Sequence, residues 1–441
     1  MKLQRREFLR TAGLASMAGI VPGLLSCDNS NTGSKDNEAV ETENIRSFAP
    51  ATTEAKNESW EEIRKQFVLD PSYVHMSGLL LASHPKPVQD AIKEYRRKLN
   101  DNPAMYVEEQ FSDLPDKVRQ RAGTYMNVHP LEIAITDSTT MGTSLLINGL
   151  HIRPDQEMLA AELDYPATHE AMEFKSQRSG ASLRKFKAYA DIHNVSEDEI
   201  VENYTNAIKP ETRLVTATWV HSSTGLKMPI KKIADSIGQI NADRGPRDRV
   251  IFFVDGVHGM GVEDTDISDL GCDFFSAGTH KWMFGPRGTG ILWGHSRSHD
   301  QVTPTIPSFT NNAGWGGRMS PGGFQAFEHK WAMAEAFQFH LDIGKERVRE
   351  RIHTFNQDLK EGLNEMRHVR LYSPMDKNLT SGMVCFDVEG MNRVEAVRRL
   401  RARNIVASFT PYARSYARLA PGLFNTSKEI ENTLKAVRDL A

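Results

Sequence analysis

Short apolar runs alternate with amphipathic patterns along the chain from about residue 60 onward. Apolar residues recur at helical spacing, which predicts helices over 85–99, 112–126 and 139–150. A short strand is predicted at 133–136, and four further runs are almost continuously apolar: 214–220, 250–254, 274–275 and 290–293. Parallel strands covered by helices on both faces have this pattern. The alternation predicts a doubly wound α/β domain with a mainly parallel sheet over about residues 78–325.

The pattern changes toward the C-terminus. A long helical pattern is followed by a strand and two helices: 327–366, 382–387, 393–402 and a last helix from Ser427. These elements predict a smaller α+β domain over 326–441, next to an N-terminal segment and large domain over 60–325. Asn425 or Thr426 is expected to cap the last helix, with Glu429 in its first turn.

The first 59 residues do not share this alternation. Residues 1–27 have a basic start, an apolar run and small residues at the end, which is the pattern of a targeting segment. Residues 28–59 are rich in Asn, Ser, Thr, Asp and Glu and have almost no large apolar side chain. Such a segment cannot bury enough surface to offset its ordering entropy, so we predict a flexible linker.

Composition narrows the classes of function. The chain has 441 residues, of which 39% are hydrophobic, enough for two or three domains. Lys and Arg number 54 against 57 Asp and Glu, a net charge of −3, and the basic residues are scattered, which argues against a nucleic acid partner. The three cysteines, Cys27, Cys272 and Cys385, are too few and too widely spaced for a disulfide framework or a Cys-rich zinc site, and we predict no metal site.

Asp255 and Lys281 are the residues that point to chemistry. Asp255 comes directly after the apolar run 250–254, at the end of the predicted strand. Its carboxylate is therefore expected at the carboxyl edge of the sheet, where α/β folds bind ligands. Lys281 lies between a short apolar run and a glycine-rich turn at 285–290. Pyridoxal phosphate (PLP) chemistry requires such a pair, because the amine forms a Schiff base with the cofactor aldehyde and the carboxylate pairs with the pyridine nitrogen.

Three short motifs carry a resemblance to a known family: Asp255-x-x-His258, His280-Lys281-Trp282 and Gly285-Pro286-x-Gly288-x-Gly290. Over about residues 70–440 the chain resembles the class V aminotransferases among the fold-type I PLP-dependent enzymes. That family also contains cysteine desulfurases, kynureninases and isopenicillin-N-epimerase-like proteins. The resemblance implies the family's fold and PLP as the cofactor. It makes Lys281 the Schiff-base lysine, Asp255 the partner of the pyridine nitrogen, and His258 a donor near the cofactor's phenolic oxygen.

The resemblance also implies a phosphate site. It places Thr139 and Thr140 against the phosphate, through backbone amides at a helix N-terminus and through the Thr140 hydroxyl. The stretch Asp137-Ser-Thr-Thr140 can also be an ordinary helix cap, and the two interpretations are compatible. Thr279 and His280 are expected on the other side of the phosphate.

Further positions follow from the same resemblance. Tyr165 is expected to stack on the cofactor ring, although a plain Tyr-Pro turn would leave the same pattern. His221 and Ser222 are expected to face the ligand. Arg418 resembles the arginine that binds the substrate α-carboxylate, a role for which its planar fork is suited. A surface arginine beside a helix cap is the alternative.

Two short patterns lie inside the targeting segment. Residues 4–10, Gln-Arg-Arg-Glu-Phe-Leu-Arg, resemble a twin-arginine export signal, and residues 24–27, Leu-Leu-Ser-Cys, resemble a bacterial lipobox. A Sec signal with incidental arginines and an amphipathic start helix are the alternatives. The twin-arginine machinery carries folded proteins, which is usual when a cofactor must be inserted before export. We therefore expect a periplasmic or membrane-anchored bacterial protein, whose membrane contact would be a lipid on Cys27.

The chain departs from the family pattern in several places, among them Met141, where many relatives carry an acidic residue. The stretch 405–417 contains no cysteine where cysteine desulfurases have their nucleophile, which argues against desulfurase activity. Gly278 replaces a serine that is common in relatives. A segment that in relatives reaches the neighbouring subunit's site is missing, and the candidates to replace it are Arg287, His329 and Lys330.

The leading hypothesis is a PLP-dependent enzyme that acts on an amino-acid-like substrate and, as the resemblance implies, forms a homodimer. Lys281 would remove and return the α-proton, a step shared by transamination, epimerisation and β-elimination, with the overall likeness nearest to epimerases. One alternative is an exported cell-envelope binding protein that keeps the fold without catalysis, although Lys281 and Asp255 are both retained. Another is a Rossmann-type oxidoreductase, but the turn at 285–290 lacks the G-x-G-x-x-G order and does not follow a first strand.

Overall fold

The structure, a computed structural model, describes residues 55–56, 58–310 and 313–441. The predicted export signal, Cys27 and most of the predicted linker lie outside these residues. In the part of the chain that is described, no helix combines the length and the apolar character needed to cross a membrane.

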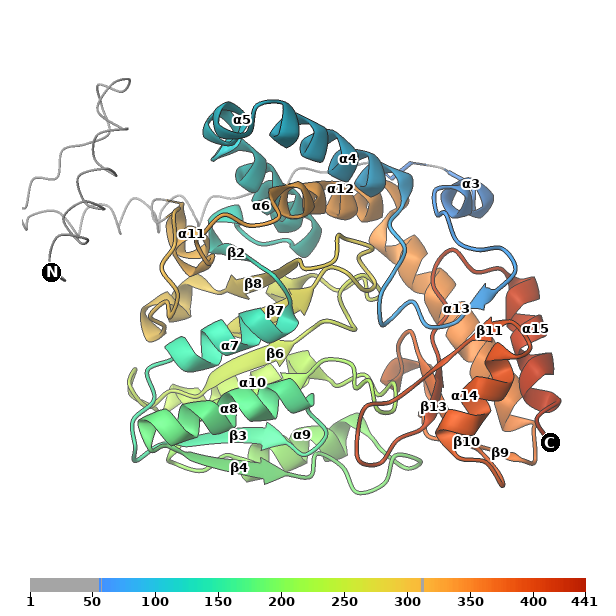
Figure 1. Ribbon diagram of the computed structural model, residues 1–441. Coiled ribbons are helices and arrows are strands. Elements are labelled where there is room, and N and C mark those ends of the chain that lie inside the picture. The colour runs from blue at the N-terminus through green and yellow to red at the C-terminus, as the bar shows by residue number, and fades with distance from the viewer. Residues whose placement is uncertain (1–54, 57, 311–312) are drawn as a thin grey trace, which may run out of the picture. The chain divides into compact units, whose positions relative to one another are not determined.

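A seven-stranded sheet forms the centre of the larger part (Figure 1). In spatial order its strands are β2 (Ile133–Thr136), β8 (Gly290–Gly294), β7 (Phe274–Gly278), β6 (Ile251–Asp255), β5 (Thr212–Thr218), β3 (Glu157–Ala161) and β4 (Ser182–Phe186). β8 runs antiparallel to both neighbours, and the other pairs are parallel. The prediction of a parallel strand at 290–293 was therefore wrong. The turn between β7 and β8 reverses the chain directly, whereas a parallel return needs a longer crossover.

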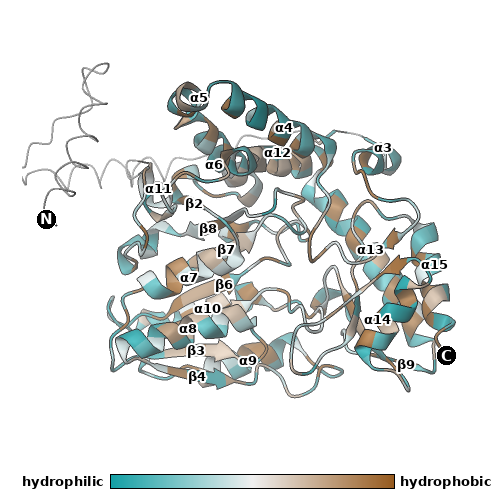
Figure 2. Cartoon of the chain, viewed as in Figure 1, coloured by the Kyte–Doolittle hydropathy of each residue, from teal (hydrophilic) through white to brown (hydrophobic). Residues whose placement is uncertain are grey.

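Alternate residues along the strands face two separate layers of helices. On β6, Phe252 and Val254 pack in one core, and Ile251 and Phe253 pack in the other. The first core also contains residues of α6 (Asp113–Met126), α9 (Glu197–Ala207), α10 (Ile230–Ala242) and α12 (Phe327–Ile343). The second contains residues of α7 (Thr139–Gly149), α8 (Pro166–Ser179) and α11 (Gly314–Met319). Because both faces are covered at the centre of the sheet, β6 is almost entirely apolar, whereas the edge strand β4 is partly exposed and more polar, as Figure 2 shows.

The predicted long helix at 327–366 is two helices. α12 ends at Ile343, and Gly344 follows with a φ of +92°, in the region that favours glycine. α13 (Lys345–Asn364) then starts in a new direction (Figure 1). The side chains of α12 pack in the core of the large sheet, whereas α13 contributes to that core and to a further one in the C-terminal part. The domain boundary proposed at residue 325 remains a prediction.

The C-terminal part contains a small antiparallel sheet, beside the large one in Figure 1. Its order is β12 (Ser408–Phe409), β13 (Ala417–Leu419), β10 (Val384–Val388) and β9 (Val369–Leu371), with α14 (Arg393–Arg401) and α15 (Ser427–Arg438) packed in the same core. The N-terminal elements are α3 (Trp60–Lys65), β1 (Val74–His75), α4 (Lys86–Asp101) and α5 (Pro103–Gln110), and β1 pairs with β11 (Ile405–Val406). Thr426 caps α15 in a reciprocal capping box with Glu429, which confirms the predicted cap.

Candidate active site

Asp255 is the last residue of β6 and lies at the carboxyl edge of the sheet. The backbone N–H of Val257 donates to one carboxylate oxygen at 3.2 Å, and the other oxygen has no hydrogen-bond partner among the described residues. Burial raises the pKa of Asp255 to about 6, although Val257 and the nearby Lys281 favour its ionised form. A buried carboxylate with an unused oxygen can accept a hydrogen bond from a protonated ring nitrogen and can stabilise its positive charge.

Lys281 follows β7 and approaches His258, which lies in the turn after Asp255. The Lys281 Nζ and the His258 Nε2 are 3.4 Å apart, and the indole N–H of Trp282 donates to His258 Nδ1 at 3.2 Å. An indole nitrogen can only donate, so a neutral His258 carries its proton on Nε2 and presents it to the lysine. Burial lowers the pKa of Lys281 to about 8, against the opposing charge of Asp255. The lowered pKa increases the fraction of the amine that is neutral and nucleophilic at neutral pH.

Arg418 lies on β13 and is only 1% exposed, so the alternative of a surface arginine is wrong. Its guanidinium donates to three neutral acceptors: Ser408 Oγ at 3.1 Å, the Ser222 carbonyl at 2.9 Å and the Phe409 carbonyl at 3.4 Å. No carboxylate of the described chain lies within ion-pair distance, and burial lowers the pKa of Arg418. Buried charges are almost always paired, so this guanidinium can accept an anion from outside the chain.

Tyr165 and Ser222 meet at a residue that sequence reasoning missed, Tyr412. The Tyr412 hydroxyl lies 2.9 Å from Ser222 Oγ, and its ring stands edge-on to Tyr165, with centroids 6.4 Å apart. Burial raises the pKa of the Tyr412 hydroxyl. The charge of Asp255 raises this pKa further, and the charge of Arg418 lowers it. Tyr412 lies in the stretch 405–417, which by the family resemblance holds the cysteine in desulfurases. An aromatic side chain in that stretch was the sequence signal that could have identified Tyr412 as a site residue.

His221 is fully buried beside Ser222. Neither of its ring nitrogens has a hydrogen-bond partner among the described residues, and burial lowers its pKa to about 4. Asp164 acts on it electrostatically but is itself occupied, because it accepts hydrogen bonds from Ala161, Thr216 and Thr218. An unpartnered buried imidazole next to these residues is available to a ligand.

The start of α7 combines the two interpretations offered for it. Ser138 caps the helix by accepting from the N–H of Met141 at 3.1 Å, so the capping interpretation is confirmed. The Thr139 hydroxyl accepts the N–H of Gly278 at 2.7 Å, which ties the helix to the end of β7. The backbone N–H groups of Thr139 and Thr140 have no partner in the described chain, and Thr140 is exposed. Free N–H groups at a helix N-terminus form an anion site.

Thr279 and His280 differ in whether their side chains keep a hydrogen-bonding atom that a ligand could use. Thr279 is fully buried, and its hydroxyl is hydrogen-bonded to Thr289 inside the turn, so the structure does not leave that hydroxyl available for a phosphate. His280 Nδ1 lies 3.4 Å from the Thr289 carbonyl, and its Nε2 has no partner among the described residues. Steric crowding explains why position 278 is a glycine and not a serine, because a Cβ there would lie 2.8 Å from His280 Cε1.

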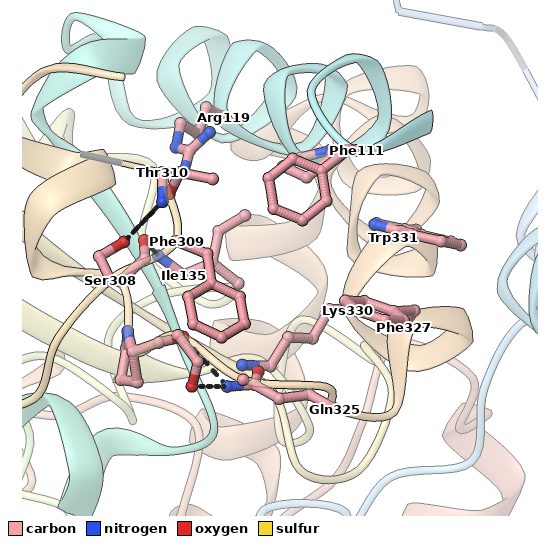
Figure 3. A pocket seen from close by; sticks show the side chains of 15 residues that line it. Phe111, Arg119, Ile135, Ser308, Phe309, Thr310, Gln325, Phe327, Lys330 and Trp331 are labelled. Carbon is pink, nitrogen blue, oxygen red and sulfur yellow. Dashed lines mark hydrogen bonds between the residues drawn. The ribbon is translucent and has the colours of Figure 1, made fainter. Parts of the chain in front are cut away.

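Lys330 comes nearest to the anion site among the candidates for the missing segment. It pairs with Asp137 at 2.8 Å, one residue before the Ser138 cap, and lines an apolar cavity of about 80 Å³ (Figure 3). His329 Nδ1 contacts the Arg287 carbonyl at 3.1 Å, and Arg287 is exposed. The structure therefore gives Lys330 an electrostatic link to the start of α7.

PLP fits what these residues leave unused. Lys281 offers an amine, Asp255 a buried carboxylate oxygen, α7 a set of free N–H groups, and Tyr165 an aromatic ring. Within the described residues, no group of three His, Cys, Asp or Glu side chains is arranged to hold a metal ion.

Comparison with known sequences adds independent findings. Residues 82–409 match the family model of class V aminotransferases. The isopenicillin N epimerase of Amycolatopsis lactamdurans is 25% identical over 87% of this chain and 99% of its own. That of Streptomyces clavuligerus is 24% identical over 86% and 97%. A probable cysteine desulfurase of Halobacterium salinarum is 23% identical over 78% and 83%.

Solved structures show the same fold. A lysine-to-alanine mutant of C-DES, with glycine covalently linked to its PLP cofactor, has a TM-score of 0.78 at 23% identity, covering 85% of this chain and 99% of its own. The cysteine desulfurase of Thermococcus onnurineus has a TM-score of 0.76 at 18% identity, covering 88% and 99%. The predicted fold class, a PLP-dependent α/β fold with a mostly parallel sheet, is confirmed.

Proposed function

Because this chain belongs to the class V aminotransferase family and has PLP as its cofactor, we propose that it acts on the α-carbon of an amino-acid-like substrate through Lys281. The contact between Lys281 and His258 carries this proposal. It combines a half-buried lysine whose pKa is lowered to about 8 with an imidazole N–H aimed at the amine. An amine with a pKa of about 8 has a much larger neutral fraction at pH 7 than an ordinary lysine, and in its neutral form it can bond to an aldehyde or accept a proton.

The residues divide the work between binding and proton transfer. When bound, PLP supplies an electron sink that acidifies the α-carbon of an attached amino acid. Asp255 holds the ring nitrogen in its protonated form, and the free N–H groups of α7 bind the phosphate. Arg418 binds the α-carboxylate, which fixes the orientation of the α-carbon. Lys281 then takes the α-proton on Nζ and returns it, while His258 positions Nζ.

The two epimerases among the relatives favour epimerisation over sulfur transfer. Cys272 and Cys385 are both buried, and burial raises the pKa of both thiols, that of Cys385 to about 12. Neither is a thiolate at neutral pH, and the loop that carries Tyr412 contains no cysteine. We expect the enzyme to release no sulfide or persulfide from cysteine.

The visible absorption spectrum of the chain from Asp28 onward, with added PLP, tests the role of Lys281. Wild type should show a band of lysine-bound PLP that borohydride removes, and Lys281→Ala should lack it. Lys360→Met is the matched control, because Lys360 is a buried lysine whose pKa is also lowered to about 8, but its amine donates to the carbonyls of Pro374 and Met375 and to Thr380, away from the candidate site. A band that survives in Lys281→Ala, or is lost equally in Lys360→Met, would contradict the proposal.

Location and assembly are proposed on the sequence patterns and the family resemblance. We propose twin-arginine export of the folded protein, a lipid on Cys27 and a homodimer. Replacing Arg5 and Arg6 by Lys should keep the protein in the cytoplasm, and replacing Cys27 by Ala should release it from membranes. Sedimentation of the chain from Asp28 onward should give twice the monomer mass.

A further inference from the structure

A second cavity, of about 360 Å³, lies where the carboxyl ends of β3, β4 and β5 face the small sheet. We call it the side cavity. Its walls include Leu163, Tyr189, Ser223, Arg370, Tyr372 and Arg414. None of the residues predicted from the sequence lines it, and the mechanism above does not use it.

The side cavity shares three loops with the candidate active site. Leu163 is two residues before Tyr165, Ser223 directly follows Ser222, and Arg414 is two residues after Tyr412. In each loop one residue lines the side cavity and its near neighbour belongs to the site of Lys281. The cavity is therefore adjacent to the site, on the side of β3 and β4.

The side chain of Ser223 has no partner in this wall. It is 3% exposed, and its hydroxyl makes no hydrogen bond with any described residue. Tyr372 and Tyr416 stack with their centroids 3.8 Å apart and form a flat apolar surface. A buried hydroxyl without a partner, beside a flat surface in a cavity of this size, is a feature that a ligand would satisfy.

Basic side chains outnumber acidic ones in the lining by three to two. Lys187, Arg370 and Arg414 form no ion pair with any described carboxylate, and the acids in the lining are Glu162 and Asp191. Asp191 accepts hydrogen bonds from the His193 N–H and from Asn194 in its own turn.

A further carboxylate, Asp387, belongs to the neighbouring cavity. It is opposite Arg370 in the β9–β10 pair. Its carboxylate interacts with the charges of three arginines, Arg370, Arg393 and Arg414. One carboxylate cannot neutralise three guanidinium groups, so Arg414 and Arg370 retain capacity for an anion.

We propose that the side cavity binds the distal end of the substrate, a carboxylate carried several bonds away from the α-carbon. Arg414 and Arg370 bind this carboxylate, Ser223 donates to it, and the Tyr372–Tyr416 pair packs against the chain that leads to it. The inference rests on the proposed function, because the near end of the same substrate is the α-carboxylate at Arg418. It narrows the substrate to amino acids with a long acidic side chain.

Straight-chain dicarboxylates without an amine test this inference, because they cannot bond to the cofactor aldehyde. Their affinities for the PLP-loaded protein, from glutarate to suberate, are measured by calorimetry beside monocarboxylates of the same length. At least one dicarboxylate should bind about tenfold tighter than its monocarboxylate. Arg414→Gln and Ser223→Ala should each reduce this preference and leave monocarboxylate binding unchanged. Arg393→Gln is the matched control, because it removes a cation that faces Asp387 from outside the side cavity.

The outcomes separate this inference from the proposed function. If monocarboxylates bind in an Arg418-dependent way but no dicarboxylate binds more tightly, the side cavity proposal is overturned and the proposed function stands. The same holds if Arg414→Gln and Arg393→Gln weaken dicarboxylate binding equally. If neither kind of acid binds, the side cavity proposal is overturned, and the Lys281 spectrum decides the proposed function separately.

Discussion

Glu263 joins the two parts of the molecule, and replacing it by Gln should destabilise the fold. Its buried carboxylate accepts from Ser381 Oγ at 2.6 Å and pairs with His353 Nε2 at 2.8 Å and Lys227 Nζ at 3.1 Å. Lys227 follows β5, His353 is on α13, and Ser381 precedes β10. Glu263→Gln keeps the shape but removes the charge that these donors face.

The size of the expected loss of stability follows from the pKa of Glu263. Burial alone would raise the pKa of Glu263, but the hydrogen bond and charge of His353, with Lys227 and Ser381, lower it from 4.5 to about 2. That difference corresponds to about 3 kcal/mol of folding free energy at pH 7. Because the folded pKa is depressed, this contribution is complete above pH 4.5 and is lost as the pH falls toward 2. The wild type should therefore lose about 1 kcal/mol more than Glu263→Gln between pH 7 and pH 4.

Urea unfolding of the PLP-saturated protein at both pH values measures this. Glu395→Gln is the control, because its pKa is also lowered to about 2 but its carboxylate is exposed to solvent among surface arginines. Exposed ion pairs contribute little to stability, so this variant should unfold like the wild type. The reasoning is refuted if Glu263→Gln unfolds within 1 kcal/mol of the wild type, or if Glu395→Gln loses as much.

Three further predictions concern binding and capping. Arg418→Gln should weaken amino acid binding about 30-fold without removing the PLP band, and a spectral titration that shows unchanged affinity would contradict its role. Gly278→Ser should weaken PLP binding about tenfold in equilibrium dialysis, because its Cβ would meet His280 and the Thr139 hydroxyl. Thr426→Ala should cost about 1 kcal/mol in urea unfolding, whereas Thr426→Ser should keep the cap and the stability.

Sequence reasoning worked best where the chemistry lies in one continuous segment. Asp255 ends one strand and Lys281 comes three residues after the next, so the local pattern was enough to single out this pair, whereas His258 came from the family resemblance. The capping of α7 and α15 was predictable for the same reason, since a cap depends on residues three or four positions apart. Family resemblance then supplied the cofactor.

Tertiary structure decided what depends on contacts between distant segments. The direction of β8 follows from how the turn after Lys281 closes, and the hydroxyl of Thr279 is used inside that turn. Arg418 is buried because β13 packs against the loop of Ser222, 196 residues away in sequence. Tyr412 and the side cavity have no local signature for the same reason. Periodicity reports which face of an element is apolar, whereas the partner of a polar group is fixed only when distant elements meet.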